Sequence, residues 1–146
     1  MKKLVDIYNK LGIDERIINI YLGGITPPDF SLHKAVKAFV RPFPPFFIPI
    51  FVFYEANFYL GLVNHFFTSR KKVFCRFALD DGYMLEVART NRQFLIEILA
   101  ESIDFNGGTL SEDIKLVGEK LELDLDLLIQ MAENYDREMP FFYNFK

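Results

Sequence analysis

The middle of this chain, from Pro44 to Ala88, carries nine of the protein's 17 phenylalanines in short runs where apolar and polar residues alternate. Side chains of a β-strand point alternately to the two faces of a sheet, so a period of two is typical of strands. Pro42, Pro44 and Pro45 separate these runs from a helix-like pattern before them. The pattern therefore predicts a sheet in the middle of the chain, preceded by helices.

Three helices are expected before the sheet. Apolar residues recur at helical spacing over residues 4–11, and a glycine follows as a stop. Asp14 can cap a second helix over 15–22, which also ends at glycine. Ser31 offers the N-cap of a third helix over 31–39, which ends before the prolines.

Four strands are expected to follow, over residues 47–54, 58–64, 73–79 and 83–88. Pro49 is acceptable only if the first strand lies at a sheet edge or if the proline lies near the start of that strand, and Gly61 in the second strand indicates a bulge or a close backbone approach. Because the runs lie close together in the sequence, an antiparallel meander is the simplest topology. Glu86 is expected to point to solvent. The buried faces are expected to carry the following side chains: Val73, Cys75, Phe77, Leu85 and Val87.

Helices return after the sheet. Thr90 and Gln93 form the T-x-x-Q pattern of a capping box, and a glycine pair ends the helix that follows. Two more helices are expected over residues 111–120 and 124–137. The start of the last helix is ambiguous, because residues 121–127 alternate leucine with acidic residues as a strand would.

The size of the chain sets the number of hydrophobic cores. The chain has 146 residues, of which 51% are hydrophobic. This length suffices to build one hydrophobic core but is too short for two cores of ordinary size. We therefore expect one domain over residues 1–146, with helices over 1–40, a sheet over 46–88 and helices over 90–139. The predicted fold class is α+β, a single antiparallel sheet of about four strands (47–88) flanked by N-terminal and C-terminal helices. No internal repeat is visible in the sequence.

Charge is distributed unevenly along the chain. Residues 1–100 carry 13 basic and 9 acidic groups, whereas residues 101–146 carry 4 basic and 11 acidic groups. An acidic half is unsuited to a phosphate backbone, and the tightest basic run, Arg70-Lys71-Lys72, is short. We expect no nucleic-acid binding.

Cysteine content and the N-terminus indicate the compartment. A single cysteine, Cys75, cannot form an internal disulfide and is typical of a reducing compartment. Asp6 and Asn9 interrupt the apolar run that a signal peptide needs. The most apolar stretch, residues 43–54, contains three prolines and is shorter than the roughly 20 residues of a membrane-spanning helix. We expect a cytoplasmic protein without membrane association.

No catalytic or metal-binding constellation accompanies this scaffold. Cys75 lies on the apolar side of a predicted strand, which is typical of a buried structural thiol and not of a nucleophile. His33 and His65 have no second ligand at metal spacing. Asp80 and Asp81 are explained by the turn that they would occupy. We expect no catalytic residue, no metal, no cofactor and thus no enzyme.

One cationic cluster is a candidate for binding a protein partner. It combines basic residues with phenylalanines: Phe66, Phe67, Arg70, Lys71, Lys72 and Arg76. A solvated turn is one interpretation. A protein-binding patch is the other, because arginine and aromatic side chains are the usual anchors of interfaces. The acidic stretch 112–126 is similarly either a solvated helix face or a surface that steers a basic partner.

The alternative class is a small-molecule-binding protein or an enzyme. Its cleft would lie between sheet and helices, and four side chains would serve it: Tyr54, Tyr59, His65 and Arg76. A third possibility is a homo-oligomer that forms through an aromatic tail, namely Phe141, Phe142 and Tyr143.

Several segments follow one another in an order known from one superfamily. They are a proline-bearing strand, a strand containing glycine, a third strand and a last strand that leads into a capped helix: Phe47-Ile48-Pro49-Ile50-Phe51, Tyr59-Leu60-Gly61, residues 73–78, and Leu85-Glu86-Val87-Ala88 before Thr90-Asn91-Arg92-Gln93-Phe94-Leu95. This order resembles the SUKH superfamily, which includes fungal cell-wall-synthesis regulators and bacterial toxin-immunity proteins, over about residues 27–103. The resemblance implies a bacterial immunity-type binding module that neutralises a toxin and has no catalytic residues.

Overall fold

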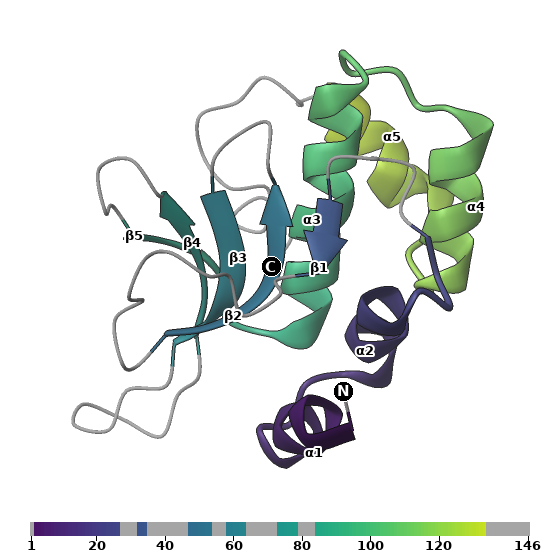
Figure 1. Ribbon diagram of the computed structural model, residues 1–146. Coiled ribbons are helices and arrows are strands. Elements are labelled where there is room, and N and C mark those ends of the chain that lie inside the picture. The colour runs from purple at the N-terminus through teal and green to yellow at the C-terminus, as the bar shows by residue number, and fades with distance from the viewer. Residues whose placement is uncertain are drawn as a thin grey trace. The chain divides into compact units, whose positions relative to one another are not determined.

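The computed structural model describes residues 2–26, 32–34, 47–53, 58–63, 73–78 and 84–133 (Figure 1). Helices and one antiparallel sheet make up these residues, so the predicted α+β class is confirmed. The chain divides into two compact units, one of Met1–Asp29 with Leu95–Lys146 and one of Phe30–Phe94. The described elements of the first unit are helical, and the second unit contains the sheet.

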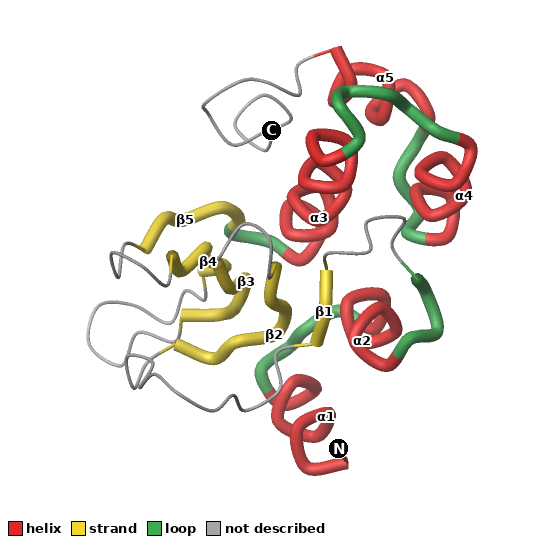
Figure 2. Tube along the Cα trace, turned by 45° about the horizontal axis from the view of Figure 1, so that its top comes forward, coloured by secondary structure: helices red, strands yellow, loops and turns green. Residues whose placement is uncertain are grey.

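The sheet is an antiparallel meander in which neighbouring strands follow one another in chain order (Figure 2). Four strands lie where the alternation predicts them: β2 Phe47–Phe53, β3 Phe58–Val63, β4 Val73–Ala78 and β5 Met84–Ala88. Each pairs antiparallel with the next. The predicted meander is thus confirmed.

A fifth, shorter strand corrects the sequence analysis. β1, Leu32–Lys34, lies in the segment expected to form a third N-terminal helix, and it pairs antiparallel with β2, with Leu32 opposite Phe53. Without this pairing, that edge of β2 would expose backbone donors and acceptors that need partners. Tertiary pairing therefore outweighs the weak local preference for a helix. Residues 35–40 of the expected helical region lie outside the described residues.

The side chains of β4 alternate between the two faces of the sheet, as predicted. Phe74 points to the face on which Phe94 packs, and their ring centroids lie 4.2 Å apart at an interplanar angle of 12°. Cys75, the next residue, lies on the other face, which carries a cluster of buried side chains: Phe47, Val52, Tyr59, Val63 and Cys75. Both faces of the sheet therefore carry buried apolar side chains.

The position of Glu86 differs from the expectation that it points to solvent. Glu86 of β5 pairs with Cys75 of β4 and shares its face, and its side chain is only 33% exposed. The next pair of β4 and β5 joins Phe74 to Ala88, so Val87 is an extra residue at a bulge. Because side chains alternate with a period of two, one extra residue moves those beyond it to the other face.

Gly61 shows both features that the sequence predicts for it. It pairs with Pro49, and the register of β2 shifts at a bulge directly after Pro49. The ring of Phe47 and the carbonyl oxygen of Ile48 lie so close that a Cβ on Gly61 would be 2.7 Å from Phe47 Cζ. Only glycine leaves room for this ring against the strand.

The helical unit begins with α1 (Lys2–Lys10) and α2 (Glu15–Leu22). Asp14 caps α2 as predicted, because its carboxylate accepts a 2.8 Å hydrogen bond from the backbone N–H of Arg16. Gly23 ends the helix with a φ of 85°, a left-handed conformation that glycine adopts without steric cost.

Helix α3, Asn91–Phe105, starts with the predicted capping box. The backbone N–H of Gln93 donates to Thr90 Oγ1 at 3.1 Å, and that of Thr90 donates to Gln93 Oε1 at 3.2 Å. All side chains from residue 94 to 100 are buried. This burial extends beyond the single apolar face that the sequence predicted for the helix.

Two helical hairpins of the first unit share one backbone pattern. Helices α4 (Glu112–Lys120) and α5 (Leu125–Glu133) begin 110 residues after α1 and α2, and α5 is one residue longer than α2. In the first turn, the backbone N–H groups of residues 11, 12 and 13 donate to carbonyls four, three and five residues earlier, respectively. The N–H groups of residues 121, 122 and 123 make the same three bonds in the second turn. Gly12 and its counterpart Glu122 both have positive φ, 73° and 59°.

The hairpins also share a turn sequence. Lys-Leu-x-Ile-Asp at 10–14 corresponds to Lys-Leu-x-Leu-Asp at 120–124, and Asp124 caps α5 by accepting from Leu127 N at 2.7 Å. The expectation that the chain has no internal repeat is therefore wrong. The repeat escapes notice in the sequence because helix packing requires apolar residues at given positions but not the same ones. Tyr8 in the first hairpin, for example, corresponds to Gly118 in the second. Leu128 packs so close to Gly118 that a Cβ on this residue would lie 2.5 Å from Leu128 Cδ1.

Candidate functional site

Arg76 is the member of the predicted cationic patch that the structure describes. Its guanidinium carbon lies 4.2 Å from the centroid of the Phe58 ring, and its neighbours across the ladder are Leu60 and Leu85. A cation over an aromatic face is stabilised by the ring quadrupole. Arg76 therefore packs within the sheet. The other members lie outside the described residues: Phe66, Phe67, Arg70, Lys71 and Lys72.

The described members of the alternative pocket do not converge. Tyr59 of β3 pairs with Phe77 of β4, so it lies on the face of the sheet opposite to Arg76, the residue before Phe77. Tyr59 is buried in the apolar cluster that includes Cys75. The other two predicted members, Tyr54 and His65, lie outside the described residues, as do Phe141, Phe142 and Tyr143 of the predicted oligomer contact.

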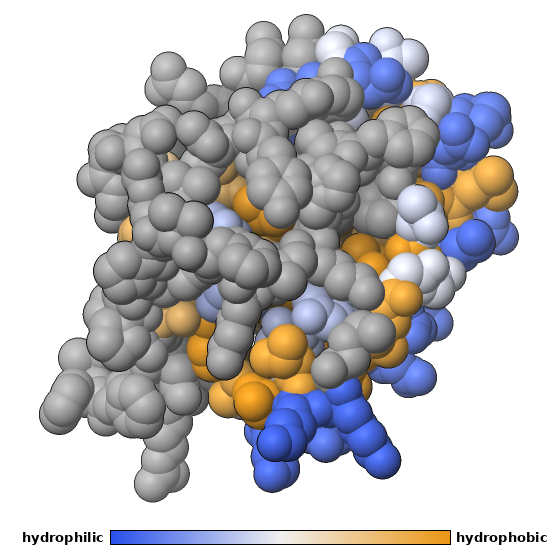
Figure 3. All heavy atoms as spheres, viewed as in Figure 1, coloured by the Kyte–Doolittle hydropathy of each residue, from blue (hydrophilic) through white to orange (hydrophobic). Residues whose placement is uncertain are grey.

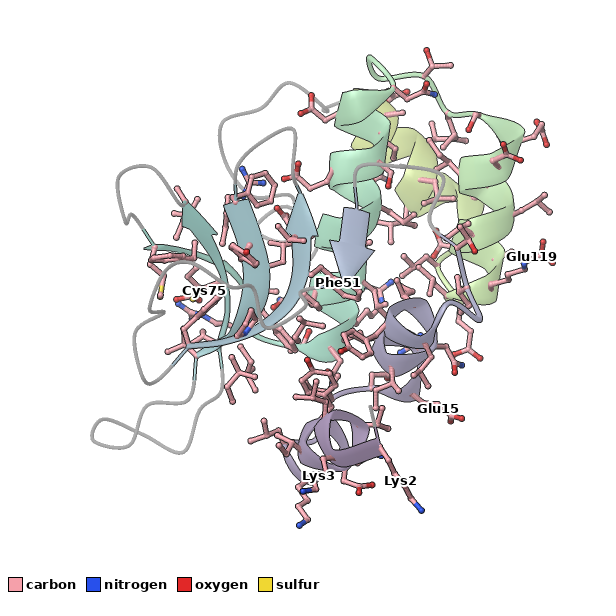
Figure 4. All side chains as sticks on the ribbon, viewed as in Figure 1. Lys2, Lys3, Glu15, Phe51, Cys75 and Glu119 are labelled. Atoms are coloured by element: carbon pink, nitrogen blue, oxygen red, sulfur yellow. The ribbon has the colours of Figure 1, made fainter. Side chains whose placement is uncertain are left out.

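Cys75 is a buried structural thiol, as predicted (Figure 4). Burial, with a smaller contribution from the negative charge of Glu86, raises the pKa of the Cys75 thiol to about 12. The raised pKa keeps the thiol protonated at neutral pH, whereas a cysteine nucleophile reacts as the thiolate. Glu86 itself forms an ion pair with Arg89.

Ionisable side chains in the first hairpin serve structural contacts. Arg16 holds the carboxylate of Asp14 through Nε and Nη2, each at 2.9 Å, and these bonds lower the pKa of Asp14. Tyr8 packs edge to face on Tyr21 at 5.2 Å, and burial raises the pKa of Tyr8. Among the described residues, no group of three His, Cys, Asp or Glu side chains is arranged to hold a metal ion.

The second hairpin presents apolar side chains to solvent on an acidic surface. Leu116, Leu125 and Ile129 are 54%, 52% and 41% exposed. Seven acidic and two basic residues lie between positions 111 and 133. Over α4, at the right of Figure 3, apolar surface lies between hydrophilic residues. Where exposed apolar side chains form a contiguous patch rimmed by polar residues, the patch is typical of sites that bind other proteins.

The acidity of this hairpin is evident in the sequence, but the exposure of its leucines was not predicted. The signal was present in the alternation of residues 121–127, where Leu121, Leu123 and Leu127 are buried but Leu125 is exposed. Once the helix is known to start at Leu125, its period of 3.6 places Leu125 and Ile129 away from the core.

Comparison of the chain with protein-family models, curated proteins and solved structures finds no match. The resemblance to the SUKH superfamily therefore stays a prediction. No helix in the described part of the chain has the length and apolar character needed to cross a membrane. The geometry alone defines a class: an α+β protein with a five-strand meander and two similar helical hairpins.

Proposed function

We propose that the protein is a non-enzymatic protein-interaction module, an immunity-type protein that binds and neutralises a toxin. The observation that carries this proposal is the second hairpin, where exposed leucines lie within an acidic surface. Apolar contacts supply affinity at interfaces, and a field of one sign speeds the approach of a partner of opposite charge.

The chemistry of the sheet supports a binding role over a catalytic one. The Cys75 thiol is buried and protonated, Arg76 lies over Phe58, and Glu86 is paired with Arg89. A nucleophile or general base needs an accessible group with a suitable pKa. These side chains instead contribute to packing.

The test uses the product of the reading frame next to this one in its genome, the position expected for a cognate toxin. That product is expressed in a bacterial host with and without this protein, and the purified pair is studied by calorimetry and light scattering. We expect restored growth and a saturable complex of fixed stoichiometry. Toxicity that this protein leaves unchanged, together with no complex formation, would reject the immunity role. A saturable thermal shift with a small metabolite would favour the alternative, a small-molecule-binding protein or enzyme.

A further inference from the structure

The two hairpins have the same backbone pattern but different outer faces, so the fold does not dictate these faces. Lys2 and Lys3 of α1 extend away from their helix, and Glu112 and Asp113 occupy the corresponding positions of α4. Residues 2–26 of the first hairpin carry four basic and three acidic groups. The second hairpin is strongly acidic, and Glu119 extends outward from α4 (Figure 4).

Helix α5 combines this acidity with an apolar stripe. Leu125 and Ile129 lie one helical turn apart, on the side opposite to the core residues Leu127, Leu128 and Met131. A spacing of four places the two exposed side chains next to each other along the helix.

Carboxylates border this stripe. Asp126 and Glu133 are exposed, and on a helix of 3.6 residues per turn they lie beside Ile129. We name the four residues Leu125, Asp126, Ile129 and Glu133 the α5 outer face.

We propose that the α5 outer face binds a basic amphipathic helix of a protein partner. This inference rests on the proposed function and adds the chemistry of the partner. Apolar side chains of the partner would cover Leu125 and Ile129, while its lysines and arginines would pair with Asp126 and Glu133. An acidic face repels the phosphates of nucleic acids and of anionic lipids, so charge complementarity favours a basic peptide.

The first experiment uses two synthetic peptides of the same lysine and leucine composition. One places its leucines at helical spacing i, i+3, i+4 and i+7, and the other distributes them around the helix. Fluorescence anisotropy measures the binding of each to the full-length protein. We expect the amphipathic peptide to bind at least about tenfold more tightly, with affinity that falls as salt rises. Equal binding of both peptides would overturn the proposal, because it would show charge attraction alone.

Variants then locate the site. The double variant Leu125→Ser with Ile129→Ser should weaken peptide binding about tenfold, because it removes the apolar contacts. The matched control, Ile7→Ser with Leu22→Ser, removes similarly exposed apolar side chains from the first hairpin and should leave binding unchanged. Equal losses in both variants would overturn the assignment.

A second variant guards against a loss of folding. Asp126→Asn with Glu133→Gln keeps the apolar stripe and should reduce the salt dependence of binding, with circular dichroism as the check on the fold. A salt dependence equal to that of the wild type would overturn the role of these carboxylates. Light scattering of the protein alone should show a monomer, since a dimer lost in the Leu125→Ser, Ile129→Ser variant would show that a second copy occupies the face.

The same variants separate this inference from the proposed function. If the toxin product binds the wild type and the Leu125→Ser, Ile129→Ser variant equally well, the α5 outer face is the wrong site but the interaction module stands. If the toxin product binds neither protein and its toxicity is unaffected, the proposed function itself fails.

Discussion

The guanidinium of Arg16 donates a 2.8 Å hydrogen bond from Nη1 to the backbone carbonyl of Leu121, a residue 105 positions away in the sequence. Leu121 lies fully buried in the turn of the second hairpin, where carbonyls at a helix end lack partners within the helix. Nη1 also lies 3.3 Å from Glu122 Oε2, while Nε and Nη2 hold Asp14. Arg16 thus connects the two hairpins.

We expect Arg16→Ala to lower the free energy of unfolding by about 1.5–3 kcal/mol, because the substitution removes a charged donor from a buried carbonyl. Arg16→Lys should recover only part of this loss, since one ammonium cannot reproduce the fork of donors. Urea unfolding measures both. The control is Arg92→Ala on the exposed start of α3, expected to stay within about 0.5 kcal/mol of the wild type. Equal effects of Arg16→Ala and Arg92→Ala would contradict a stabilising bridge.

Asp14 makes stability depend on pH in the acidic range. Its folded pKa is lowered, first of all by the side-chain hydrogen bonds from Arg16. The ion pair therefore stabilises the fold above the unfolded pKa of about 3.9, and this stabilisation is lost as pH falls through the lower folded pKa. Asp14→Asn keeps a good N-cap but removes the charge. We expect it to cost about 0.5–2 kcal/mol at neutral pH, and less and less as pH falls below about 4.

The control for this prediction is Asp124→Asn in the second hairpin. Asp124 has the same capping role, but Asp126 stands where the first hairpin has Arg16. The substitution should cost less at neutral pH than Asp14→Asn, as measured by chemical unfolding across a pH series. A pH-independent cost of Asp14→Asn would argue against the ion pair.

A methyl group at Gly61 should disturb the packing of the sheet. A Cβ there would meet the Phe47 ring and the Ile48 carbonyl. We expect Gly61→Ala to destabilise the fold by about 1–3 kcal/mol through overpacking, as measured by thermal or urea unfolding. Gly24→Ala is the control, because its Cβ would lie 3.6 Å from the Asn19 carbonyl oxygen, an ordinary contact. A Gly61→Ala protein as stable as Gly24→Ala would show that the ring does not need this space.

The Cys75 thiol should react slowly in the folded protein. With a pKa of about 12, its thiolate fraction at neutral pH is about a thousandfold below that of an ordinary cysteine, and burial also restricts access of the reagent. We expect an aromatic disulfide reagent to modify the native protein at least about a thousandfold more slowly than it modifies the urea-unfolded chain. Intermediate urea concentrations should raise the rate in step with the unfolded population. Immediate modification of the native protein would refute the buried position.

Local signals in the sequence were sufficient for most elements. Asp14 and Thr90 cap helices as predicted, because a cap acts on N–H groups only two or three residues away. The alternation over β2 to β5 predicted the strands, since it reports directly which side chains share a face.

Features that depend on a distant partner were not predicted. β1 forms because β2 offers it an edge, and Glu86 faces Cys75 because a bulge shifts the register of β5. The cation–π contact of Arg76 with Phe58 has the same origin, since it joins residues of two neighbouring strands.

Composition and periodicity were enough to establish an α+β chain with an apolar, phenylalanine-rich meander and an acidic C-terminal part, because both properties are carried by neighbouring residues. The shared backbone pattern of the two hairpins and the bridge from Arg16 to Leu121 emerged only in three dimensions, as did the start of α5 that leaves Leu125 and Ile129 exposed. These features depend on which helix faces pack together between segments about a hundred residues apart in the sequence, and neighbouring residues do not encode that choice.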